Sequence, residues 1–339
     1  MRAAPLAACA AAMALAAAAV AAPALPQQAK GDHVVSIAYI EVPEVDFGAF
    51  RQTVHTLLGE HAAFAAEGLR KLEDTRGKFL DAGGTTLAMV LPFPPPEPGV
   101  DPRLADPEPF VLIRLRKDED EPAMRQMLAD LAGGGKQIVT LFAPGWLSYS
   151  QEETPQPGDP GEHRKRLDAA LAAAGKSPAG LVFAPNPPFR TMQRTVVKQE
   201  ADEVDLPIVV KKFMDFWLEL VEAQWLAFSV TLGEEPRATG VCLMPTEDAA
   251  ARLGQRLKAI GETARKIDQG TLEDPRMPLD EPHVAQLLKS LVPFENIKLT
   301  QDGPKLTFEL TTAQLRAFTL PWVFMARHAR PAPPPPPNP

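Results

Sequence analysis

Two short segments of this chain share one pattern of residue types, in which a tryptophan leads an alternating aromatic strand. They are Trp146-Leu147-Ser148-Tyr149-Ser150 and Trp225-Leu226-Ala227-Phe228-Ser229. Because side chains alternate along a strand, each Trp points away from the Leu and the aromatic residue that follow it. Arg114 and Arg116, in another predicted strand, can stand on the same open sheet face. Rings beside guanidinium groups would bind a protein partner or an apolar ligand, unless a loop or the other half of the chain covers each Trp.

Motifs for covalent or phosphate chemistry are weak. Gly175-Lys176-Ser177 is similar to the end of a phosphate-binding loop, but Ala170 stands where such a loop needs its first Gly. The triplet also follows a predicted helix, whose carboxyl end repels phosphate. The sequence has no G-x-S-x-G or H-E-x-x-H pattern, so we assign no catalytic residue and no cofactor. A hydrolase-like enzyme with a site assembled from distant residues is the alternative.

Metal ligation is also poorly supported, and we predict no metal site. His55 and His61 are six residues apart on a predicted helix and therefore do not share a face. The acidic run Asp118–Glu121 suits the first turn of a helix, where the dipole favours negative charge. A calcium loop would instead alternate its ligands and include a central Gly. A second acidic run, Glu200–Asp205, is best explained as a solvated connection.

The net charge of −8 argues against nucleic acid as a partner. The two basic runs, Arg114–Lys117 and His163–Arg166, are short and isolated. Neutralising a phosphate backbone requires clustered positive charge, which neither run supplies.

Residues 1–24 have the features of a secretory signal peptide. Arg2 precedes an uncharged apolar run over residues 6–22, and Ala22-Pro23-Ala24 predicts cleavage after Ala24. A retained membrane anchor is the alternative, although the Ala-rich run is at the short limit for spanning a bilayer. No other segment has about 18 uncharged apolar residues, so the mature chain is predicted to be soluble, in the periplasm or outside the cell.

Cysteine and proline usage adds two expectations. Removing the signal leaves Cys242 as the one cysteine, which excludes a disulfide within the chain and suggests a packed core thiol. The 37 prolines concentrate in a predicted loop at Pro92–Pro109 and in a tail at residues 330–339. The tail is predicted to be disordered and extended, and it could tether an envelope protein.

Alternation of apolar and polar residues predicts half-buried strands. In the segment 224–232, Leu226 and Phe228 point to one side while Trp225 and Ala227 point to the other. The segments 305–310 and 110–116 follow the same rule. We therefore predict an α+β fold with a largely antiparallel sheet and helices on one face.

The order of these elements occurs twice along the chain. The best-matching hairpins span residues 138–149 and 297–308, each around a Pro–Gly or Gly–Pro turn. We predict two similar halves, residues 25–178 and 179–329, each built from two β-hairpin–helix units.

The exported start, the paired hairpin–helix units and the Trp-Leu-x-aromatic-Ser strand resemble exported bacterial proteins of unknown function with duplicated α+β halves. The resemblance covers residues 33–328. It implies a fold and a compartment, and it brings no catalytic residues. These features together predict a non-catalytic exported binding or cell-envelope module that uses an open sheet face or the cleft between the halves.

Overall fold

The computed structural model describes residues 23–59, 62–94, 108–132, 137–150, 161–175, 177–203, 206–277 and 282–316. Its strands are β1 (Val34–Glu41), β2 (Gly84–Pro92), β3 (Phe110–Leu115), β4 (Ile138–Ala143), β5 (Trp146–Ser150), β6 (Ala179–Phe183), β7 (Trp225–Thr231), β8 (Arg237–Leu243), β9 (Lys298–Asp302) and β10 (Lys305–Leu310). The longer helices are α2 (Phe47–Leu58), α3 (Ala62–Asp81), α4 (Glu121–Ala132), α5 (Glu162–Ala174), α6 (Pro187–Glu203), α7 (Ile208–Leu220), α8 (Glu247–Asp268) and α9 (Pro282–Leu291).

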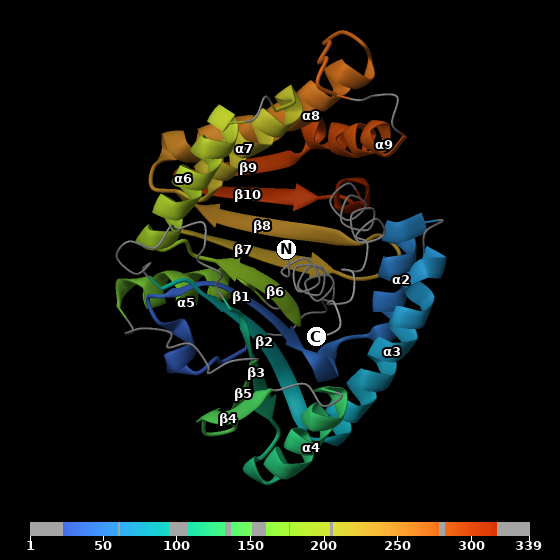
Figure 1. Ribbon diagram of the computed structural model, residues 1–339, viewed down its shortest axis with the longest axis vertical. Coiled ribbons are helices and arrows are strands. Elements are labelled where there is room, and N and C mark those ends of the chain that lie inside the picture. The colour runs from blue at the N-terminus through green and yellow to red at the C-terminus, as the bar shows by residue number, and fades with distance from the viewer. Residues whose placement is uncertain are drawn as a thin grey trace, which may run out of the picture.

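The ten strands form one antiparallel sheet in the order β4-β5-β3-β2-β1-β6-β7-β8-β10-β9 (Figure 1). This confirms the predicted α+β class with an antiparallel sheet. The first and second parts of the chain meet at the central β1·β6 pair, so they build one continuous sheet. Reading outward from that pair gives the same order of strands in both directions. A duplication would produce such an order, and common descent of the halves stays a prediction.

One row of apolar side chains crosses the whole sheet. Each strand contributes one residue through its register with the next: Val139, Tyr149, Val111, Met89, Ala38, Leu181, Phe228, Gly240, Phe308 and Leu299. Gly240 belongs to the row because the Phe308 ring lies over it, where a side chain at 240 would clash. Phe308 also meets the Phe228 ring edge-on, with centroids 5.1 Å apart.

Most helices cover the face that carries this row, which we call the helix-rich face. Figure 1 shows α7, α8 and α9 at the β9 end of the sheet, and α3 and α4 at the β4 end. The helix α5 differs from the prediction of helices on one face, because Leu167 and Leu171 pack with Trp225 and Ala227 on the opposite face. The other side of β7, represented by Leu226, packs toward α8. Both faces of β7 are apolar, and this allows a helix on each.

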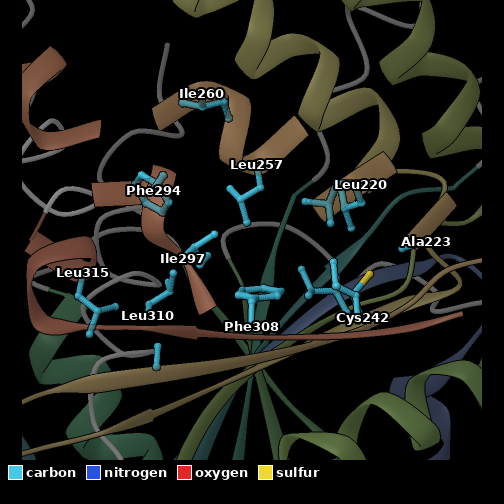
Figure 2. Close-up of a cluster of buried hydrophobic side chains, with 14 of the residues drawn as sticks. Leu220, Ala223, Cys242, Leu257, Ile260, Phe294, Ile297, Phe308, Leu310 and Leu315 are labelled. Carbon is cyan, nitrogen blue, oxygen red and sulfur yellow. The ribbon is translucent and has the colours of Figure 1, made fainter. Parts of the chain in front are cut away.

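The largest core cluster lies between α8 and the strands β7, β8 and β10. Figure 2 shows Leu257 and Ile260 of α8 above Phe308 and Leu310 of β10. α8 comes close to the short helix Val292–Asn296 because Gly261 has no side chain: a Cβ there would lie 2.1 Å from the Glu295 nitrogen.

Short polar side chains cap the starts of two helices. The Asp46 carboxylate accepts the Gly48 and Ala49 N–H groups at the start of α2, and Thr246 Oγ1 accepts Ala249 N–H in α8. Gly59, whose φ is +55°, ends α2 and separates it from α3.

Within the described residues, no helix combines the length and apolarity needed to cross a membrane. The predicted signal cleavage site lies at the border of this part of the chain. Most of the predicted Pro92–Pro109 loop and the whole proline tail lie outside the described residues.

Replacing Gly261 with Ala should lower the free energy of unfolding by about 1–3 kcal/mol, because the new methyl group overpacks the contact between α8 and Glu295. Gly68→Ala in α3 is the matched control, since nothing lies within 4 Å of a Cβ there. It should raise stability by up to about 1 kcal/mol through helix propensity. Urea unfolding measures both changes. Equal stability of Gly261→Ala and the unmodified protein would contradict the close approach.

Cys242 should be inert in the folded protein. Its side chain is fully buried beside Met244, and burial raises the pKa of the thiol to about 12. A maleimide reagent at neutral pH should therefore modify no thiol until denaturant is added. After denaturation, one reactive thiol indicates that residues 1–24 have been removed, whereas two indicate that Cys9 is retained. Rapid labelling without denaturant would contradict the buried position.

Candidate functional site

The structure places the two predicted tryptophans on one face, but it buries both rings. Trp146 is 6% exposed and Trp225 is 8% exposed, and both belong to the cluster beneath α5. The alternative, in which another part of the chain covers each Trp, therefore applies. Neither Trp146 nor Trp225 offers exposed aromatic surface. Trp146 lies in β5 and Trp225 in β7, so the two positions are not equivalent in the repeated strand order.

Of the two predicted arginines, only Arg114 lies beside a tryptophan. Arg114 pairs with Trp146 across β3 and β5, whereas the Arg116 guanidinium turns to α3 and donates to the Leu80 carbonyl at 2.9 Å. On its other side, Arg114 faces Thr86. Arg114 is thus part of a polar cross-strand row on the α5 face.

That polar row contains a half-buried carboxylate. Thr86 Oγ1 donates to Glu41 Oε2 at 2.7 Å, and burial raises the pKa of Glu41 while the positive charge of Arg114 partly offsets the rise. These contacts join β1, β2 and β3. The arrangement explains cross-strand cohesion, and it brings no nucleophile to the carboxylate.

The groups that could do hydrolytic chemistry have structural partners instead. His163 Nε2 bonds to the Val34 carbonyl, the Ser177 hydroxyl donates to the Ala179 carbonyl at 2.6 Å, and the Ser36 hydroxyl donates to Val182. No cluster of three or more His, Cys, Asp or Glu side chains suited to a metal occurs in the described segments. The hydrolase alternative thus gains no support from these residues.

A groove of about 650 Å³ lies between α6 and α7, and it has the size of a small-ligand site. Its apolar lining comes from Val197 of α6 and from Ile208, Met214 and Leu218 of α7. Met214 and Leu218 are four residues apart and therefore share one side of α7, whereas Ile208 lines the groove at the start of that helix. The groove can therefore hold a hydrocarbon chain against a preformed apolar floor.

Four cationic side chains and one carboxylate complete the groove: Arg194, Lys198, Lys211, Lys212 and Asp215. Two of these charges are already paired, Arg194 with Glu222 at 2.8 Å and Asp215 with Arg256 at 3.4 Å. Lys198 and Lys212 make no ion pair with any described residue. The rim is therefore net positive and has two ammonium groups available to a ligand.

The start of α6 is fixed by one buried amide. The Asn186 side chain accepts the Phe189 N–H at 2.9 Å and donates to the Phe93 carbonyl at 2.9 Å. It is 2% exposed and also reaches the carbonyls of Asp32 and His33. This cap ties the helix to the ends of β1 and β2, so one wall of the groove is set by the sheet.

α7 is fixed at both ends. Its first N–H, of Ile208, donates to the buried carboxylate of Asp274 at 2.6 Å. Near its other end Glu219 accepts from Arg252 at 2.9 Å and pairs with Arg256 at 3.3 Å. Between these points the Trp217 indole N–H donates to Gln193 of α6 at 2.8 Å. These contacts set the position of α7 against α6 and α8, and with it one wall of the groove.

The outer side of α7 adds exposed apolar surface next to the groove. Phe213 is 46% exposed and Val210 is 37% exposed. Sequence reasoning did not single out this site. The sequence feature that could have indicated the groove is the Arg194/Lys198 pair at i,i+4 together with Lys211-Lys212. Helices exposed to solvent often have the same pattern, so it did not stand out.

No family model, no curated protein and no solved structure matches this chain, so the site rests on its own geometry.

His163 should make stability depend on pH. Burial lowers the pKa of this histidine below its usual 6.5, so the unfolded chain takes up a proton at a pH where the folded chain does not. The free energy of unfolding should therefore be fully retained above about pH 6.5 and should fall as the pH decreases below that value. His163→Gln should flatten this decline in urea titrations between about pH 7.5 and 5.5. Glu41, whose raised pKa acts with the opposite sign at lower pH, is present in both proteins and cancels in the comparison. Identical pH profiles would contradict a buried, neutral His163.

Proposed function

We propose that the protein is an exported, non-catalytic binding protein that takes up an amphiphile with an anionic head and a hydrocarbon tail in the groove between α6 and α7. The observation that carries this proposal is the combination of an apolar floor with a positive rim in a groove of about 650 Å³. Export is part of the proposal and is supported by the features of residues 1–24.

The floor favours a chain over a compact polar ligand. Ile208, Met214 and Leu218 present aliphatic or thioether surface without hydrogen-bonding groups. Burying a methylene group in such surroundings is favourable by about 0.8 kcal/mol, so affinity should grow with tail length. A sugar or a nucleotide would leave its hydroxyl groups without partners there.

The rim selects the head group. The ammonium groups of Lys198 and Lys212 are compact charges on flexible stems that can reach a carboxylate, sulfate or phosphate above the floor. The acidic run Glu200–Asp205 was predicted to be a solvated connection, but α6 continues through it to Glu203. It adds four carboxylates next to the rim in sequence, and their side chains lie outside the described residues. Those carboxylates would compete with an anionic ligand for the lysine side chains of the rim. Replacing them by amides therefore tests the role of the rim charge.

Calorimetric titration with dodecanoate should detect binding that the double variant Lys198→Gln/Lys212→Gln weakens by about tenfold, because two charge contacts of about 0.7 kcal/mol are lost. Lys305→Gln in β10 is the matched control and should bind as the unmodified chain does. Raising the salt concentration should weaken binding by the unmodified chain more than binding by the double variant.

Two further ligands separate the contribution of the charged head from that of the hydrocarbon tail. Dodecanol, which lacks the charge, should bind more weakly than dodecanoate, and acetate, which lacks the tail, should not bind. Amide substitution of the four carboxylates in Glu200–Asp205 should strengthen dodecanoate binding. Absence of dodecanoate binding, or equal binding by the double variant, would overturn the proposal.

A further inference from the structure

The first turns of α5 and α6 are anchored at adjacent residues of the chain, where β1 begins. His163 of α5 bonds through Nε2 to the backbone carbonyl of the first residue in β1. The Asn186 amide, at the start of α6, donates to the carbonyl of the residue just before it at 3.3 Å. Arg166 follows His163 by three residues, and Arg190 follows Asn186 by four. Each arginine therefore shares a side of its helix with the residue that anchors that helix.

The guanidinium groups brought to this point act on one another and on the His163 ring. Burial lowers the pKa of Arg190 below its usual value, and the carboxylate of Glu222 partly offsets this decrease. The positive charges of Arg166 and Arg194 add to the decrease. Burial is also the main cause of the lowered pKa of His163, to which Arg166 and Arg190 contribute. Positive charge is therefore concentrated where α5 meets α6, in a chain whose net charge is −8.

The described carboxylates near this point are already engaged by other cations. Glu222 accepts two hydrogen bonds from the Arg194 guanidinium on one oxygen, at 2.8 and 2.5 Å. Asp168 pairs with Lys30 at 2.6 Å and with Arg164 at 3.7 Å. These pairs compensate Arg194 and the cations beside Asp168, and they leave the other two guanidinium groups without a carboxylate of their own among the described residues.

Hydrogen-bond donors of those two guanidinium groups also lack acceptors in the described part of the chain. Arg166 is partly buried and has no hydrogen-bond or ion-pair partner there. Arg190 donates a terminal nitrogen to the Ala223 carbonyl at 2.8 Å, whereas its Nε is buried without an acceptor. Buried donors are normally satisfied by a protein group, a water molecule or an ion. A negatively charged ligand would supply both the acceptors and the missing charge.

We propose that Arg166 and Arg190 bind a dianionic phosphate group between the first turns of α5 and α6. The two negative charges of such a group match the two positive charges that have no carboxylate of their own. A guanidinium fork donates to phosphate oxygens in pairs, and the tetrahedral arrangement of these oxygens lets one ligand meet arginines from two helices. A planar carboxylate presents its two oxygens on one side only. The proposal does not rest on amphiphile binding in the α6–α7 groove.

Calorimetric titration with inorganic phosphate, at constant ionic strength and about pH 8 where phosphate is a dianion, should detect saturable binding. Arg166→Gln should weaken this binding by about tenfold or more, because a charge-assisted contact is lost. Lys165→Gln is the matched control. It makes the same change in net charge one residue away, at an exposed side chain that pairs with Glu162 at 2.5 Å, and it should bind phosphate as the unmodified chain does. Arg166→Lys, which keeps the charge but loses the fork, should bind with intermediate affinity.

The His163 ring provides a second readout, which a purely structural role of Arg166 would not change. Bound phosphate should raise the pH midpoint of the His163 ring signals in NMR spectra, because the dianion offsets the positive charges of Arg166 and Arg190. Asp32, the other charged group that acts on this ring, is present in every variant. The increase should persist in Lys165→Gln and disappear in Arg166→Gln.

Dodecyl phosphate distinguishes a free phosphate from the head group of an amphiphile. A free ligand predicts equal affinity for inorganic and dodecyl phosphate at this site, whereas a head group predicts tighter binding of dodecyl phosphate. Arg166→Gln should weaken binding in either case. The double variant Lys198→Gln/Lys212→Gln should bind inorganic phosphate as the unmodified chain does, so the result is independent of dodecanoate binding.

Three results would overturn the phosphate site. They are an unmodified chain that does not bind inorganic phosphate, binding that Arg166→Gln leaves unchanged, and equal weakening by Lys165→Gln. Far-UV circular dichroism and thermal unfolding should show that Arg166→Gln is folded, since the Arg166 side chain bonds to no described residue.

Discussion

The apolar row from Val139 to Leu299 constrains the rest of the molecule. It requires every strand to present an apolar residue, or in one case Gly240, at the same level of the helix-rich face. A one-residue slip of any strand would turn that strand's polar side chains into the core, so the row fixes all the registers together. The helices must then cover a band that runs the full width of the sheet. This requirement explains why they are spread from β4 to β9 instead of gathering at one end.

The α6–α7 groove depends on that arrangement. α7 is held to α8 through Glu219 and its two arginines, and it contacts the sheet through the Trp217 and Phe183 rings, whose centroids are 6.1 Å apart. These contacts use the inner side of α7. Its remaining sides, with Lys212 and Phe213, are therefore free to meet a ligand without disturbing the core. Under the proposed function, ligand binding and core packing use different sides of the same helix.

Local sequence signals predicted the strands and hairpins well. They did not predict which side chains would be buried by helices from distant parts of the chain. Alternation and turn residues predicted the β4–β5 and β9–β10 hairpins, because these signals act over a few residues. Strand parity correctly put Trp146 and Trp225 on one face but could not say whether α5 would cover them, since that depends on residues far away in sequence. The groove was missed for the same reason: its two walls look like ordinary solvated helices until packing brings them together.

The central β1·β6 pair has a consequence for how the chain is made. β1 ends at Glu41 and β6 begins at Ala179, so a ribosome must add well over a hundred residues before β1 receives its second neighbour. Until then the first five strands carry two open edges, β1 and β4, and β6 closes the first of them. Pairings between such distant segments form late and slowly. A nascent first half is thus a species that needs shielding from other chains, and a factor that binds extended strands would find its target at Val34–Glu41.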